Sequence, residues 1–278
     1  MTIQRVRSKS AKTEALLASP EMAEHVPQTR PMSRHSVREM LQQYGMIYVK
    51  PVNGTFGLGV IRLEWAPDKA YPYWFQSSLR QYRFRAFDAM YDKLLAVKRR
   101  KSYLAQQGIE LLKHDGRRFD FRVMVQRNPQ SAWETTGIIG RLAHPLKIVT
   151  NYHSGGTPMP FEQLMQLHLS DEQSLQDYRQ KLEKLGVDVA RALELRFPRL
   201  QEIGIDVAID GELKPWILEV NTMPDPFLFR KLKDPAVFRR IYEYAVSYGR
   251  FPRVRRRPAV KQQATRRSRN PGRKTRSR

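Results

Sequence analysis

A carboxylate and an amide stand two residues apart near the end of an apolar segment that covers residues 214–224. Side chains two positions apart share one face of a strand, so Glu219 and Asn221 are expected to present their oxygens side by side. Hard oxygen donors of this kind suit Mg²⁺, which keeps waters and substrate phosphates as its other ligands. The pair therefore indicates part of a magnesium site, although an ordinary strand with an exposed acid has the same short pattern.

A second apolar segment, residues 203–209, precedes the first and is joined to it by Asp210 and Gly211. An Asp-Gly pair between two apolar segments is a strong signal for a β-hairpin. Asp206 lies on the first strand of this hairpin and could complete a three-oxygen metal site with the two oxygen donors of the second strand. Asp210 is better explained as the turn residue.

A glycine-rich segment follows a predicted strand at residues 46–51, with glycines at positions 54, 57 and 59 ahead of a second β-prone stretch. Glycines allow backbone N–H groups to approach an anionic ligand closely. No Gly-Lys-Ser/Thr follows, which excludes a Walker loop, and Lys50 precedes the glycines, whereas the lysine of a protein kinase follows them. The segment is compatible with phosphate binding and equally with a tight turn between exposed strands.

Taken together, the lysine, the glycine-rich hairpin and the later acidic cluster resemble the ATP-grasp superfamily. Within it, the chain is similar to the YheC/YheD family of spore-coat-associated ATP-grasp proteins, with ribosomal-protein glutamate ligases as more distant relatives. The resemblance covers roughly residues 27 to 248 and is carried, in order, by residues 48–51 with their glycines, 106–109, 116–123, 151–156 and 204–221. It implies an α+β fold in which two α+β subdomains clasp ATP.

The resemblance also implies a role for each matching residue in nucleotide binding. Lys50 would contact the α- or β-phosphate, and the glycine-rich segment would close over the phosphates as a lid that includes Asn53, Gly54, Gly57 and Gly59. Adenine would lie against the segment that links the two lobes, at Gln106, Gln107 and Ile109. Gln107 stands where many ATP-grasp enzymes have Glu, which weakens its side-chain contact to the adenine amino group but leaves contacts from backbone donors and acceptors possible.

Two arginines and an asparagine are expected at the phosphate end of this site. Arg122 and Arg141 are placed near the γ-phosphate because a guanidinium offers a planar fork that matches phosphate oxygens. For Arg122 the alternative is an outward-facing charge on a strand of alternating pattern. Asn151 would lie near the phosphates and the metal, and its alternative role is an Asx turn. The metal, Mg²⁺ or Mn²⁺, would be held by Asp206, Glu219 and Asn221.

The net charge of +23 is concentrated in the two ends of the chain. Residues 250–278 contain 13 Lys or Arg and no acid, and residues 1–12 contain 4 with no acid, which leaves 33 basic against 27 acidic residues elsewhere. The C-terminal tail has too few large apolar residues to offset its ordering entropy and is expected to be disordered. Such a tail can bind an anionic polymer or nucleic acid by neutralising phosphates, or it can be a solvated end without a partner.

The pattern of apolar residues predicts a mixed α and β organisation. A polar N-terminal segment, residues 1–34, is expected to be partly disordered, and residues 35–249 to form the ATP-grasp domain, with a lid subdomain at about 46–102 and a C-terminal lobe at about 103–249. Ser33 or Ser36 could cap the first helix of the domain. Helices are predicted at residues 36–44, 85–100, 171–195 and 235–248, and strands at 103–112 and 119–126, with residues 133–148 also rich in β-prone residues.

Composition limits the remaining possibilities. A 278-residue chain with 41% hydrophobic residues can bury a substantial core. The absence of cysteine excludes disulfides, thiolate catalysis and Cys-ligated zinc. No apolar run is long enough to span a membrane and no signal-peptide pattern begins the chain, so a cytoplasmic protein is expected, with a spore association implied by the resemblance.

Two functions from different classes fit these features. The first is an ATP-dependent ligase that joins an unidentified carboxylate to an unidentified amine through an acylphosphate. The second is a non-catalytic, spore-coat-associated or polyanion-binding protein that keeps a degenerate ATP-grasp fold. Only about 45 residues precede the Lys50 strand, too few for the N-terminal substrate domain of most ATP-grasp enzymes. Those enzymes also have a second phosphate-binding lysine before the glycine-rich hairpin, whereas Lys9 and Lys12 lie here in a segment expected to be mobile.

Overall fold

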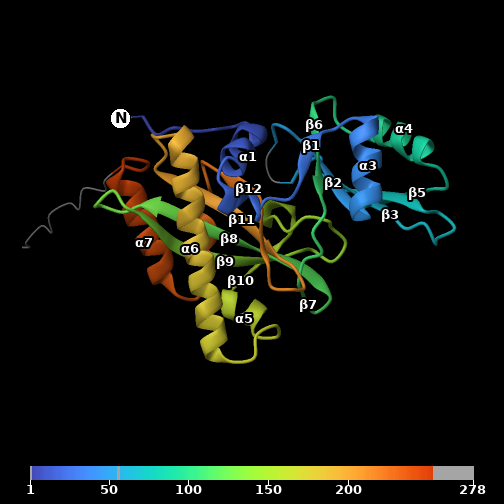
Figure 1. The fold of residues 1–278 in the computed structure, drawn as a ribbon. Coiled ribbons are helices and arrows are strands. Elements are labelled where there is room, and N and C mark those ends of the chain that lie inside the picture. Colours follow the sequence, from blue (N-terminus) through green and yellow to red (C-terminus); the bar gives the residue numbers. More distant parts are fainter. Residues whose placement is uncertain (1, 55–56, 253–278) are drawn as a thin grey trace, which may run out of the picture.

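Two antiparallel sheets, each covered by helices, divide the fold into two lobes (Figure 1). The computed structural model describes residues 2–54 and 57–252. The first sheet has the strand order β1-β6-β2-β3-β4-β5, and the second has the order β10-β9-β8-β11-β12, with β7 paired to β8. The predicted α+β fold class is therefore confirmed.

The first lobe consists of one six-stranded sheet with two helices packed on one of its faces. Alternation along β2 sends Ile47 and Val49 into the core under these helices, so the residues between and after them, Tyr48 and Lys50, belong to the opposite face. The elements are β1 (Thr29–Pro31), α3 (Arg34–Tyr44), β2 (Met46–Pro51), β3 (Ile61–Trp65), β4 (Tyr73–Ser77), β5 (Arg80–Phe84), α4 (Phe87–Val97) and β6 (Tyr103–Gln107).

Helix α3 begins with a reciprocal cap that involves both of the predicted serines. Ser33 is the N-cap and its hydroxyl accepts a hydrogen bond from the Ser36 backbone N–H, while the Ser36 hydroxyl accepts one from the Ser33 N–H. This arrangement satisfies two backbone donors that a helix start otherwise leaves unpaired. The helix in turn leads directly into β2 and so sets the position of Lys50.

The second lobe packs helix α6 on one face of its sheet, and α7 with the short helix η2 on the other. On β8, Phe121 and Val123 face the α6 core, whereas Met124 faces α7. Asp120 and Arg122 share the face of Met124 by the same alternation. The elements are β7 (Lys113–His114), β8 (Arg117–Arg127), β9 (Trp133–Leu142), η1 (Tyr152–Ser154), β10 (Thr157–Met159), α5 (Phe161–Met165), α6 (Glu172–Arg196), β11 (Glu202–Ile209), β12 (Pro215–Asn221), η2 (Phe227–Lys231) and α7 (Pro235–Ser247).

The N-terminal segment differs from the mobile chain that its polar composition predicts. Residues 9–17 form α1 (Lys9–Leu17), which is followed by α2 (Pro20–Ala23). Ala15, Leu16 and Met22 are buried in the core that α6 forms with the second sheet. These few apolar side chains lie on one face of short helices, so their burial orders the segment although its other face is polar. The segment then continues into β1 and thereby joins the second lobe to the first (Figure 1).

The predicted hairpin and helices are present, with small differences at their ends. Strands β11 and β12 are antiparallel, and the Asp210 carboxylate accepts hydrogen bonds from the Glu212 and Lys214 backbone N–H groups, as expected for a turn residue. Strand β6 ends at Gln107, well before the predicted residue 112, next to the first residues of its partner strand β2. The proposed division into domains remains a prediction.

Two predictions concern the ends of the chain and membrane association. Most of the basic tail, residues 253–278, lies outside the described residues, so its predicted disorder remains a prediction. In the part of the chain that the structure describes, no helix is long and apolar enough to cross a membrane.

Candidate functional site

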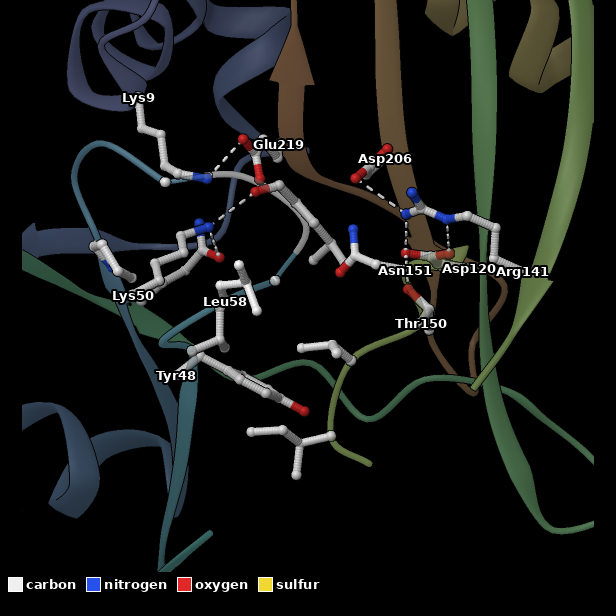
Figure 2. Close-up of a pocket in the computed structure, with 18 of the residues that line it drawn as sticks. Lys9, Tyr48, Lys50, Leu58, Asp120, Arg141, Thr150, Asn151, Asp206 and Glu219 are labelled. Atoms are coloured by element: carbon white, nitrogen blue, oxygen red, sulfur yellow. Dashed lines mark hydrogen bonds and ion pairs between the residues drawn. The ribbon is translucent and has the colours of Figure 1, made fainter. Parts of the chain in front are cut away.

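A pocket between the two lobes collects most of the predicted site residues (Figure 2). It is lined by strands of both sheets and by two loop segments, one from the glycine-rich hairpin and one that follows β9. The predicted residues in its lining are Lys50, Gly54, Gly57, Gln106, Gln107, Arg141, Asn151, Asp206 and Glu219. The other predicted residues, all of them described, lie outside this lining: Asn53, Gly59, Ile109, Arg122 and Asn221.

Lys50 joins the two lobes at the centre of the pocket. Its ammonium donates hydrogen bonds to Gln106 Oε1 at 2.6 Å and to the Leu218 carbonyl of the second lobe at 3.1 Å. Burial, together with the nearby positive charge of Lys9, lowers the pKa of Lys50 to about 8. The site therefore holds a cation whose charge is poorly compensated by its neighbours and would be stabilised by an anionic ligand.

Lys9 is a site residue that the sequence analysis set aside. It is the first residue of α1, and its ammonium lies 2.6 Å from Glu219 Oε1, so that the two side chains point toward each other (Figure 2). Lys12, one turn along the helix, is buried beside them, and burial lowers the pKa of its ammonium. The N-cap Ser8 and the i, i+3, i+4 spacing of Lys12, Ala15 and Leu16 were signals that could have located this helix.

Asp206 lies at the point where three strands meet. In the register of the sheet it pairs with Arg122 on β8 and with Glu219 on β12. Arg122 Nε lies 2.6 Å from Asp206 Oδ1, and Arg141 Nη2 lies 3.0 Å from its Oδ2. Burial alone would raise the pKa of Asp206, but the two guanidinium groups lower it to about 2. The carboxylate is therefore charged at neutral pH and paired with two cations.

Asp120 and Thr150 complete this network and were not predicted. Arg141 donates to both carboxylate oxygens of Asp120, at 2.8 and 2.6 Å, and the Thr150 hydroxyl donates to Asp120 Oδ2 at 2.7 Å. Burial by itself would lower the pKa of Arg141, but the negative charges of Asp120 and Asp206 outweigh this effect and raise the pKa above its ordinary value. The position of Asp120 two residues before Arg122 on a predicted strand was the available signal, because such residues share a face.

The glycine-rich segment closes one side of the pocket against the loop that contains Asn151. Gly57 has a φ of +71°, and a Cβ atom at this position would lie 2.6 Å from Asn151 Oδ1. Glycine is therefore required both by the left-handed backbone and by the close approach of the amide. The Asn151 side chain does not cap the following helix η1, where the turn is closed by the Asn151 backbone carbonyl. Asn151 is thus available to a ligand on its pocket side.

The predicted adenine segment is only partly open to the pocket. The Gln107 N–H donates to the Gln28 carbonyl at 2.8 Å, and the Gln107 side-chain oxygen accepts from the Gln28 N–H at 3.2 Å. These bonds occupy the backbone N–H of Gln107 and its side-chain oxygen. Tyr48 and Leu111 provide apolar surface at the same end of the pocket, whereas Ile109 is buried outside it.

Two of the predicted metal ligands, both carboxylates, line the pocket. Asp206 and Glu219 face each other across neighbouring strands and line one pocket, so they fit an octahedral cation whose remaining ligands are waters and phosphate oxygens. Asn221 pairs with Gly204 in the register and does not line the pocket. Among the described residues, no group of three His, Cys, Asp or Glu side chains could hold a metal ion. Of the three predicted ligands, Asp206 and Glu219 therefore line the pocket and Asn221 does not, and the metal site itself remains a prediction.

A comparison with protein families agrees with this geometry. The model of the YheC/D-like ATP-grasp family matches residues 2–251. The chain belongs to this family. The match includes α1 and Lys9, which lie before the region to which the sequence resemblance was assigned. The resemblance and the ATP-grasp fold predicted from the sequence are therefore confirmed.

Two curated relatives come from Bacillus subtilis (strain 168). The endospore coat-associated protein YheD is 24% identical over 241 residues, which cover 81% of this chain and 52% of that protein. The endospore coat-associated protein YheC is 20% identical over 201 residues, which cover 72% of this chain and 55% of that protein. The chain thus spans about half the length of the curated relatives that it matches.

Proposed function

We propose that this protein binds Mg-ATP in the pocket between its lobes and acts as a ligase that joins a carboxylate to an amine. The observation that carries this proposal is the arrangement around Lys50 and Lys9, two cations that face a pocket containing Asp206 and Glu219. Cations and carboxylates that line one cavity suit a triphosphate and its divalent cation. Membership of the ATP-grasp family supports the nucleotide as the ligand.

Each residue of the pocket has a distinct role in this proposal. Lys50 and Lys9 contact phosphate oxygens, and residues 57–60 cover them. Asp206 and Glu219 would hold the Mg²⁺ or Mn²⁺, which when bound neutralises charge on the transferring phosphoryl group. Arg141, held in place by Asp120, keeps a positive potential at the same end of the pocket.

The reaction proceeds in two transfers. A carboxylate oxygen of the substrate attacks the γ-phosphorus, the bond from that phosphorus to the β–γ bridging oxygen breaks, and ADP leaves. The amine then attacks the acyl carbon of the acylphosphate, phosphate leaves, and the nitrogen loses a proton. The protein contributes positioning and charge stabilisation to both steps, and no side chain is assigned as a base.

Calorimetric titration with ATP, with and without Mg²⁺, tests the nucleotide site. Wild type is expected to bind ATP more tightly with Mg²⁺, Glu219→Gln to lose most of this difference, and Lys50→Ala to bind ATP weakly under both conditions. Glu212→Gln is the matched control, because Glu212 lies exposed in the turn of the same hairpin. Equal binding by wild type and both site variants would refute the proposed site.

A non-catalytic role is the second candidate, and the charge balance of the pocket favours it. Asp206 and Asp120 are already neutralised by Arg122 and Arg141, so these acids are stable in the fold without a metal. In this case the protein would be a cytoplasmic, spore-associated protein whose basic tail holds an anionic polymer or nucleic acid. Deletion of residues 253–278 would then abolish binding to heparin at low salt, whereas retained binding would count against this role.

A further inference from the structure

A second cavity lies on the outer side of the segment that covers the nucleotide pocket. Five residues line both cavities, namely Gly57, Leu58, Val60, Ile148 and Val149, so only this layer separates them. The wall consists of the glycine-rich segment of the first lobe and the loop after β9 of the second. A ligand in the outer cavity would therefore contact the same residues that line the proposed nucleotide pocket.

Three cations from both lobes line this outer cavity. Lys98 and Arg99 follow the end of α4, and Lys147 lies in the loop after β9. No carboxylate is among the described residues that line it. Within the described part of the chain, none of these cations forms an ion pair, and neither do the adjacent Arg100 and Lys101.

Lys98 and Arg99 lie against Tyr103 of β6, and Arg99 also passes Gly59 of the glycine-rich segment. Arg99 donates its backbone N–H to Tyr103 Oη at 3.3 Å, and its side chain passes Gly59 so closely that a Cβ there would lie 3.3 Å from Arg99 Cδ. The Lys98 ammonium lies 5.0 Å from the centre of the Tyr103 ring. A helix C-terminus attracts cations, which accounts for Lys98 and Arg99 but not for Lys147 of the other lobe. Like charges that meet across a cavity repel unless an anion lies between them.

We propose that this outer cavity is a recognition site for the carboxylates of an acidic polypeptide. The proposal rests on the proposed ligase function and names the substrate class for it. The anionic part of the substrate would bind here, remote from the reacting groups, and hold the covering segment of the first lobe against the loop of the second. Remote binding energy of this kind favours the closed arrangement in which transfer occurs.

The lining favours carboxylates over nucleic acid. Proteins that bind single-stranded nucleic acid combine cations with exposed aromatic rings on which bases stack. Tyr103 is the one aromatic side chain among the described lining residues, and it is buried with Lys98 over its ring. The rest of the surface is aliphatic or small, which suits the side chains of a peptide.

Lysine footprinting locates the binding of a short acidic probe, the peptide Glu-Glu-Glu. The full chain is treated with an acetylating reagent with and without the peptide, and the modification of each lysine is measured by mass spectrometry. Lys98 and Lys147 are expected to be protected at least threefold, while Lys69, an exposed lysine of the first lobe, and Lys261 of the tail are unchanged. Uniform protection of all four lysines would overturn the proposal, because it would indicate non-specific attraction.

A double variant with a matched control measures the contribution of the cavity to affinity. Arg99→Gln with Lys147→Gln is expected to bind the peptide about tenfold more weakly than wild type. Lys69→Gln with Arg83→Gln removes the same charge from another surface of the first lobe and should bind as wild type does. Equal weakening of peptide binding in both double variants would overturn the proposal. In the footprinting experiment, stronger protection of Lys147 by a single-stranded oligonucleotide than by the peptide would also overturn it.

Titration of the same proteins with ATP separates this proposal from the proposed function. If wild type binds no ATP but Lys147 is protected by the peptide, the ligase function fails and the anion site remains. If ATP binds normally to wild type and the peptide protects neither Lys98 nor Lys147, the nucleotide site remains and the anion site fails.

Discussion

The ammonium of Lys9 lies 2.6 Å from the carboxylate of Glu219, although 209 residues separate them in the chain. The contact joins the first residue of α1 to the strand end that carries the predicted metal ligand (Figure 2). The lysine thus neutralises the acid that we propose as a magnesium ligand. A ligand that brings both phosphate and a divalent cation supplies a new partner for Lys9 and another for Glu219.

Lys9→Gln should weaken ATP binding in the presence of Mg²⁺ by about tenfold, because one phosphate contact is lost. Removal of the ammonium should also strengthen the binding of Mg²⁺ alone, because Glu219 no longer has a competing partner. Calorimetry measures both affinities. Lys184→Gln, on the exposed side of α6, is the control and should change neither. Unchanged ATP affinity in Lys9→Gln would exclude this lysine from the phosphate site.

ATP affinity should fall as the pH rises above about 8, because the pKa of Lys50 is lowered to about 8 in the free protein. Above this pH, binding requires uptake of a proton and can weaken by up to tenfold per pH unit. Lys50→Arg keeps its charge and should abolish the dependence between pH 8 and 9.5. Affinities from titrations at several pH values, compared between the two proteins, provide the measurement, and parallel profiles would contradict the assignment.

Whereas ATP affinity should fall with rising pH, the contribution of Lys50 to folding stability should rise. The unfolded chain keeps the proton of Lys50 up to its ordinary pKa of 10.5, whereas the folded protein releases it near 8. The unfolded state therefore binds more protons between these values, and the contribution of Lys50 to stability rises with pH in that window. Below pH 8 the Lys50 ammonium is charged in the folded and in the unfolded protein but buried only in the folded one. In this range its burial lowers the free energy of unfolding most.

Gly57→Ala should weaken ATP binding, whereas Gly116→Ala should not. Both glycines have a φ close to +70°, so alanine strains the backbone at each and costs about 1 kcal/mol of folding stability. Only at Gly57 would the new Cβ meet a neighbour, Asn151 Oδ1 at 2.6 Å, whereas nothing lies within 4 Å at Gly116. The difference in ATP affinity between the two variants therefore measures displacement of the covering segment. Equal affinities would show that this segment does not contact the nucleotide.

Asp206→Asn should destabilise the fold by about 3 kcal/mol at neutral pH without Mg²⁺. The substitution leaves Arg122 without its 2.6 Å partner and removes one of the two carboxylates that hold Arg141. Buried guanidinium groups cannot lose their protons, so their uncompensated charge lowers the free energy of unfolding. Urea denaturation measures the loss, and Asp225→Asn, outside this network, is the control. A loss below about 1 kcal/mol would indicate that water readily reaches the network.

Much of the pocket could be predicted because its signals are local. The β-branched and aromatic residues before Lys50 predicted a strand at this position, and the Asp-Gly turn predicted the hairpin across which Asp206 pairs with Glu219. The predicted cap at Ser33 or Ser36 was similarly local and is present. Such features depend on neighbours within a few residues, whose spacing can be counted along the chain.

The sequence by itself determined the family, the α+β class and many of the candidate site residues, because motifs and periodicity are properties of short segments. Only the tertiary structure decided which of them share a cavity. It brought Lys9 to Glu219 and Asp120 to Arg141, and it left Asn221 outside the lining. Each of these outcomes depends on how strands and helices far apart in the chain pack, and that packing comes from burial of apolar faces rather than from any local spacing.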